Sequence, residues 1–300
     1  MQRDPLASEK YHEGPMSRLT LLVCALALTS GCELFKKTTE PTPPAPANEI
    51  RYTAIGASDA IGIGASVPCL PFVACPTGTG YVQTLARQLE NGGKTVTLMN
   101  LGLPGAVLGP DTQILGASVG LDIFGNFLER EVPFVPRETT VVTVFAGGND
   151  VNTVGSALKR GQGGSNPTAF IQTQTQNFSR DLNALVAGIR SRAANARIVI
   201  LNLPNLAALP YNAGLSLQEK QVMQQIAVAF SAQINALTSQ NVLVIDLMCD
   251  GAMYRAGMFS SDGFHPNDAG YARLATLAFG AASTGTSSAP RTACGQMTLY

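Results

Sequence analysis

The chain has 300 residues, of which 45% are hydrophobic and 13% are charged. This composition excludes an intrinsically disordered chain and is ample for one sizeable core. Twenty basic residues balance twenty acidic ones, so the formal net charge at pH 7 is zero. With no clustered basic face and no nucleic-acid motif, we expect no DNA or RNA partner.

The N-terminal segment has the pattern of a bacterial lipoprotein signal. Counted from Met16, it has a short positive region, an apolar stretch over residues 19–28 and small residues that end at Cys32. The apolar stretch is too short for a permanent membrane helix, which predicts cleavage before Cys32 and a lipid on that cysteine. Thr29 stands where such signals usually have leucine, so an ordinary cleaved signal peptide remains the alternative.

The composition divides the chain into four predicted parts. A signal segment over 1–31 is followed by a Pro/Thr/Ala-rich tether over 32–49, which cannot pack a core and would hold the next part off the membrane. The folded domain is predicted over 50–282 and a low-complexity tail over 283–300. We expect an exported protein of the bacterial cell envelope, at the outer membrane or facing the periplasm, or a secreted one if the signal is of the ordinary kind.

The predicted domain alternates strand-like and helix-like segments. Short β-prone runs occupy residues 51–55, 95–99, 139–145, 198–201 and 242–245. Apolar residues at helical spacing occupy residues 80–89, 170–194, 217–237 and 268–279. Five strands separated by helices fit one doubly wound parallel sheet.

Glycine and small polar residues follow each of the first three strands. The first strand runs into Gly56-Ala57-Ser58, the second into residues 100–105 and the third into residues 146–150. Open parallel sheets bind ligands at this edge. Ser58, at a strand-to-helix turn, is a candidate nucleophile, the alternative being an ordinary helix N-cap. The other two turns could supply hydrogen-bond donors for an oxyanion.

A second candidate group lies near the C-terminal end, in the run Ser-Asp-Gly-Phe-His-Pro over 261–266. His265 is the only histidine outside the predicted signal, because His12 precedes the cleavage site. Imidazole suits general base chemistry near neutral pH, and Asp262 is close enough in sequence to orient the ring. The alternative is a surface turn, since Asp-Gly and His-Pro are both turn-forming pairs.

In their order along the chain, these four segments resemble the blocks of the SGNH hydrolases, the GDSL-type esterase and lipase family. The resemblance covers about residues 50–282 and implies an α/β fold, a flavodoxin-like three-layer α/β/α sandwich with a five-stranded parallel sheet. We expect no cofactor and no metal. The residue roles that the resemblance implies are a triad and an oxyanion hole: catalytic Ser58, Asp262 and His265, with oxyanion donors Ser58, Gly105 and Asn149.

The first block departs from the family pattern, because Ala57 stands where the family name has aspartate. That aspartate has no assigned proton-transfer or oxyanion role, so the implied catalytic set is intact. Its loss puts in question the hydrogen bonding that holds Ser58. Asp59 could compensate in part, but we favour an exposed aspartate at the helix start.

Cysteine usage agrees with export. With Cys24 in the signal and Cys32 assigned to lipid, an even number of cysteines remains for an oxidising compartment: Cys69, Cys75, Cys249 and Cys294. Four cysteines allow three pairings, of which we favour Cys69 with Cys75 and Cys249 with Cys294. A zinc site is the rival, although the spacings match no common finger.

The segment 106–138 holds more apolar side chains than a bare connection needs. They are Ile114, Leu115, Leu121, Ile123, Phe124, Phe127, Leu128, Phe134 and Val135. Some could line an acyl pocket, but for any single residue we favour the core face of one or two helices.

The expected function is carboxylic-ester hydrolysis through a serine acyl-enzyme, on a small-molecule, lipid or glycan ester. Two alternatives remain open. One is a deacetylase of acetylated glycans or peptidoglycan. The other is a non-catalytic lipoprotein that binds a lipid or glycan on the same fold.

Overall fold

The computed structural model describes residues 46–300. The expected signal segment over 1–31, the expected lipidation site Cys32 and most of the expected tether lie outside the described residues. Among the residues described, no helix combines the length and the apolar character needed to cross a membrane.

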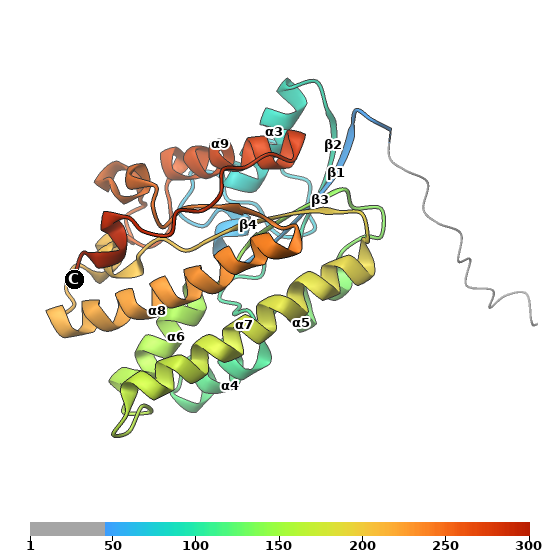
Figure 1. Ribbon diagram of the computed structural model, residues 1–300. Coiled ribbons are helices and arrows are strands. Elements are labelled where there is room, and N and C mark those ends of the chain that lie inside the picture. Colours follow the sequence, from blue (N-terminus) through green and yellow to red (C-terminus); the bar gives the residue numbers. More distant parts are fainter. Residues whose placement is uncertain (1–45) are drawn as a thin grey trace, which may run out of the picture. The chain divides into compact units, whose positions relative to one another are not determined.

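The core of the fold is one sheet of five parallel strands in the order β2-β1-β3-β4-β5 (Figure 1). The strands are β1 (Glu49–Gly56), β2 (Thr95–Asn100), β3 (Val141–Phe145), β4 (Arg197–Leu201) and β5 (Leu243–Ile245). The chain passes from β1 to one side for β2 and then to the other side for β3. The strand order therefore reverses at β1, and its carboxyl end is the place where such sheets bind ligands.

Helices cover both faces of the sheet and complete a three-layer sandwich (Figure 1). They are α2 (Ser58–Ile61), α3 (Tyr81–Asn91), α4 (Pro110–Ser118), α5 (Phe127–Arg130), α6 (Gly148–Lys159), α7 (Pro167–Arg192), α8 (Leu217–Ala236) and α9 (Asp268–Thr284). One face carries α3 and α9, and the other carries α4 to α8. The all-parallel α/β sandwich expected from the sequence is confirmed.

The long helices form because their apolar residues recur on one face. In α3 the buried residues Val82, Leu85 and Leu89 follow helical spacing. In α9 the buried face is largely alanine, which lets the helix lie close to α3. A capping box closes the start of α8, where Ser216 accepts from the Glu219 amide.

The segment 106–138 forms two short helices, α4 and α5, and the 3₁₀ turn η1 (Val132–Phe134). The patterns above did not predict α6, because its first turn is the Gly-Gly-Asn-Asp motif, where glycine masks the helical spacing.

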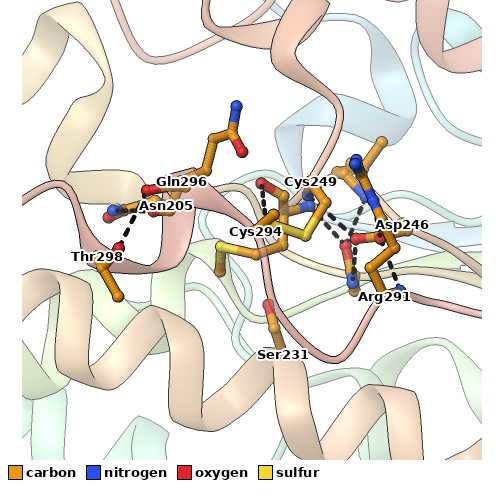
Figure 2. The surroundings of a disulfide bond; sticks show 12 residues. Asn205, Ser231, Asp246, Cys249, Arg291, Cys294, Gln296 and Thr298 are labelled. Atoms are coloured by element: carbon orange, nitrogen blue, oxygen red, sulfur yellow. Dashed lines mark hydrogen bonds and ion pairs between the residues drawn. A yellow bond between two sulfur atoms is a disulfide. The ribbon is translucent and has the colours of Figure 1, made fainter.

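Both disulfides that we favoured are present, Cys69–Cys75 and Cys249–Cys294. Figure 2 shows the second one, which ties the C-terminal segment to the loop after β5. Beside it, the Asn205 side chain donates to the Gln296 carbonyl at 2.8 Å. The tail therefore packs on the domain next to the loop that follows β4.

Candidate active site

Ser58 lies directly beyond the carboxyl end of β1, as the first residue of α2. Glycine at the end of β1 avoids crowding, because a Cβ on Gly56 would lie 3.0 Å from the Ala60 Cβ and 3.1 Å from the Phe145 carbonyl oxygen, closer than most such contacts. Ala57 is the N-cap, so Ser58 does not cap the helix with its side chain. Its hydroxyl is therefore free for another partner.

That partner is His265, whose Nε2 lies 2.7 Å from the Ser58 Oγ. On the other side of the ring, His265 Nδ1 lies 2.6 Å from Asp262 Oδ2. In the tautomer that satisfies both contacts, the Ser58 hydroxyl donates to Nε2 and the Nδ1–H donates to the carboxylate. The structure thus brings together the three residues that the sequence predicted as a triad, in a geometry suited to a nucleophile, a base and an orienting acid.

Asp262 is held within the histidine loop, residues 259–266, whose two ends pair as a β-bridge. Its Oδ1 accepts the backbone amides of Phe264 at 2.8 Å and of His265 at 2.9 Å, and the Ser260 hydroxyl at 2.9 Å. Gly263 makes the turn possible with φ of +71°, and its carbonyl accepts the Tyr211 amide. The side chain of His265 is 16% exposed and that of Asp262 is 43% exposed, so the ring is sheltered while the carboxylate touches solvent.

The electrostatics of this loop favour an ionised Asp262. Partial burial raises the pKa of Asp262, but the hydrogen bonds from the His265 side chain, the His265 and Phe264 amides and Ser260 outweigh it. The pKa of Asp262 therefore lies well below its ordinary value. An ionised carboxylate at this position can stabilise a protonated imidazole.

Gly105 lies in the segment after β2, and Asn149 lies at the start of α6 after β3, both at the carboxyl edge of the sheet. The connection from β2 to α4 is hydrogen-bonded to the end of β1, because the Leu103 amide donates to the Gly56 carbonyl at 2.9 Å. Gly105 then turns with φ of +72°. Asn149, in the first turn of α6, donates its Nδ2 to the Ala106 carbonyl at 2.8 Å. This bond orients the amide and leaves its second N–H for a ligand.

Two buried acids, neither of them expected from the sequence to have a role, lie close to this region. Asp150 is fully buried, and its carboxylate accepts the Leu108 amide at 3.1 and 3.2 Å. Burial raises the pKa of Asp150 to about 7, although bonds from Leu108 and Thr112 oppose the rise. Glu131 is also fully buried, and its Oε2 accepts the Gly56 amide at 2.9 Å.

The sequence places Asp150 next to Asn149 in the third block, but no local pattern indicates that its side chain is buried or that it accepts the Leu108 amide. Glu131 lies outside every block, and only the fold brings it to Gly56.

The expectation of an exposed Asp59 is wrong. Asp59 is half-buried and lines the pocket beside Ser58, and burial raises its pKa while the neighbouring His265 opposes that rise. The side chain shares the wall of this pocket with Phe264 and Pro266, because α2 is a single turn at the end of β1.

A narrow apolar pocket opens beside the triad, with a cavity volume of about 50 Å³. Its walls come from the ends of β1 and β3, the loop after β4 and the histidine loop. They include Ala106, Phe127, Asn149, Leu203, Leu206, Leu209, Phe259 and Phe264. Of the apolar residues named above between 106 and 138, only Phe127 lines this pocket. Val135 is buried in the core, whereas Ile114, Phe124 and Phe134 are more than half exposed, which neither interpretation expected.

Over residues 46–300, no group of three or more His, Cys, Asp or Glu side chains is arranged to hold a metal ion.

Several solved structures share this fold. A lipase from a goat rumen metagenome is 20% identical with a TM-score of 0.53, over 79% of this chain and 98% of that one. A phospholipase A1 from Streptomyces albidoflavus is 17% identical with a TM-score of 0.51, over 77% and 98%. An extracellular lipase from Streptomyces rimosus is 18% identical with a TM-score of 0.50, over 76% and 97%.

A comparison with curated protein sequences returns no match. The model of the GDSL-like Lipase/Acylhydrolase family matches residues 54–273. This range contains Ser58, the turns with Gly105 and Asn149, and the histidine loop. The chain therefore belongs to the GDSL-like Lipase/Acylhydrolase family.

Proposed function

We propose that the protein is a carboxylic-ester hydrolase that works through an acyl-enzyme on Ser58. The observation that carries the proposal is the contact between Ser58, His265 and Asp262, with distances of 2.7 and 2.6 Å. Membership of a hydrolase family supports the reaction class.

In the proposed mechanism, Ser58 Oγ attacks the ester carbonyl while His265 takes the serine proton. The protonated imidazole then gives that proton to the leaving alcohol, and Asp262 holds the ring and stabilises its charge. Water enters, loses a proton to His265 and attacks the acyl-enzyme, so that the acid leaves and the serine is restored.

The negative charge of each tetrahedral intermediate requires donors. The amides of Ser58 and Gly105 and the free N–H of Asn149 are the groups proposed for this role. The first N–H groups of a helix have no intrahelical acceptor, which leaves the Ser58 amide available. The bond from Asn149 to Ala106 supports the assignment because it fixes the amide before substrate arrives.

The pocket favours an apolar acyl group. Its walls are almost entirely aliphatic and aromatic, and Asp59 is the one acidic side chain among the residues that line it. An alkyl chain would bury against Leu203, Leu206 and Phe264 without leaving polar groups unpaired.

A panel of esters tests the proposal. The purified protein is assayed with p-nitrophenyl esters from acetate to dodecanoate and with acetylated sugars, alongside a Ser58→Ala variant. We expect cleavage of medium-chain acyl esters that the variant loses. Preference for acetylated sugars would instead identify a glycan deacetylase, and no cleavage of any ester, with binding retained, would identify a non-catalytic protein.

We also infer that the enzyme is carried on the cell envelope by a lipid on Cys32, as the signal pattern indicates. Metabolic labelling with a radioactive fatty acid tests this. The wild-type protein should take up label and fractionate with membranes, and Cys32→Ser should lose both properties. Unlabelled, soluble wild-type protein after export would favour an ordinary signal peptide.

A further inference from the structure

Glu131 is a fully buried acid at the junction between α5 and η1. Its Oε2 accepts the backbone amide of Gly56 at 2.9 Å. Its Oε1 has no hydrogen-bond partner within the described residues. A buried polar group in this state costs stability, so its presence needs an explanation.

The bond between Glu131 and Gly56 lies at the end of β1, where two segments of the proposed site meet. Gly56 is the last residue of β1, and its carbonyl accepts the Leu103 amide at 2.9 Å. Two residues beyond Gly56 is Ser58, and two residues beyond Leu103 is Gly105. The Glu131 carboxyl therefore contacts the residue that leads to Ser58 and that also binds residues 101–105, the oxyanion loop, through its carbonyl.

We propose that Glu131 is a positioning residue, whose carboxyl group fixes the end of β1 so that the amides of Ser58 and Gly105 converge on one oxyanion. This inference rests on the proposed function. Glu131 supplies the acceptor for the Gly56 amide where the strand ends, while Gly56 in turn holds the oxyanion loop through its carbonyl.

The carboxyl group must be neutral for this role. A buried anion bonded to Gly56, two positions before Ser58, would oppose the negative charge that develops on the oxyanion. The environment meets this requirement: no basic side chain within residues 46–300 pairs with Glu131. Burial raises the pKa of Glu131 well above its ordinary value, against smaller opposing effects of the Gly56 and Leu103 amides.

Two substitutions separate positioning from space filling. Glu131→Gln keeps the size and an oxygen acceptor without the ability to ionise, whereas Glu131→Leu keeps similar bulk but leaves the Gly56 amide unpaired. Glu129→Gln, also on α5, is the matched control, because Glu129 contacts Asn126 and not the strand end. Each variant is checked for folding by circular dichroism before kinetics.

With the best p-nitrophenyl ester, we expect Glu131→Gln and Glu129→Gln to keep kcat/KM within about threefold of wild type at every pH from about 6 to 9. Glu131→Leu should lower kcat by about tenfold or more with KM nearly unchanged, and should slow labelling by a fluorophosphonate. Infrared difference spectra between wild type and Glu131→Gln should contain the band of a protonated carboxylic acid.

A folded Glu131→Leu with wild-type kcat would overturn the inference. If the leucine variant does not fold, Glu131→Gln decides: a loss of more than about tenfold in kcat, or a changed pH profile, would exclude a neutral acceptor. A wild-type protein that cleaves no ester would refute the proposed function instead, and that outcome is distinct because it appears before any substitution.

Discussion

The Nε2 of His265 lies 2.7 Å from the Oγ of Ser58, although the two residues are 207 positions apart in the chain. The parallel sheet accounts for this proximity. Ser58 follows the strand at which the sheet order reverses, and the histidine loop follows the edge strand β5, with both segments at the carboxyl edge. If the site works as proposed, each contact around this pair has a measurable consequence.

Asn149→Ala should lower kcat by about a hundred- to a thousandfold, because it removes one donor to the oxyanion. Thermal unfolding should change little, since the side chain makes one bond, to the Ala106 carbonyl. Asn152→Ala, one turn further along α6, is the matched control and should keep full activity. An unchanged rate for Asn149→Ala would remove this residue from the proposed oxyanion hole.

Asp262→Asn should lower kcat by up to about 10⁴-fold, the loss seen when the orienting acid of a serine triad becomes an amide that favours the wrong imidazole tautomer. The loop should remain folded, because the amide oxygen can still accept from Phe264 and His265 as Oδ1 does now. Steady-state kinetics and a thermal melt measure the two effects. Activity near that of wild type would mean that His265 does not need Asp262.

The raised pKa of Asp150 predicts that the free energy of unfolding depends on pH. Its pKa is raised by burial to about 7 in the folded protein, so the folded state holds a proton that the unfolded chain releases near pH 4. The free energy of unfolding should therefore decrease as pH rises from about 4 to 7, by up to roughly 4 kcal/mol from this group.

Urea unfolding of wild type and Asp150→Asn at pH values across this range measures that contribution. The stability advantage of wild type over the variant should shrink as the pH rises, because asparagine does not titrate. A difference between the two proteins that is constant with pH would show that Asp150 does not titrate in this window.

The two disulfides should differ in their contribution to stability. Cys249–Cys294 closes a loop with a sequence separation of 45, and Cys69–Cys75 one with a separation of 6. In the chain-entropy treatment these loops are worth about 4 and about 2 kcal/mol. Paired cysteine-to-serine variants, compared by urea unfolding, should rank in that order. Greater destabilisation from removing the short loop would contradict this account.

The parts of the fold that could be predicted are those with a local signature. Apolar runs mark the strands, and the periodicity of α3, α7, α8 and α9 marks the long helices. Helix α6 has no such signature, because glycines occupy its start. The exposure of Asp59 was predicted wrongly because a helix-start aspartate is usually solvated, and only the fold places it in a pocket wall with Phe264 and Pro266.

The candidate site could be predicted as far as its residues fall in short blocks. Ser58, Asn149, Asp262 and His265 each stand in a block, and the structure brings Ser58, Asp262 and His265 into one hydrogen-bonded row. Glu131 acts through a tertiary contact to a backbone amide. A backbone amide carries no side-chain pattern, so no reading of the sequence could have paired the two.

The most direct test of the central claim is covalent labelling with a fluorophosphonate, followed by mass spectrometry of the labelled peptide. The account predicts one modified residue, Ser58, with labelling lost in Ser58→Ala and kept in Ser66→Ala, whose hydroxyl bonds Asp268 outside the triad. Labelling that persists in Ser58→Ala, or that maps to another residue, would contradict it.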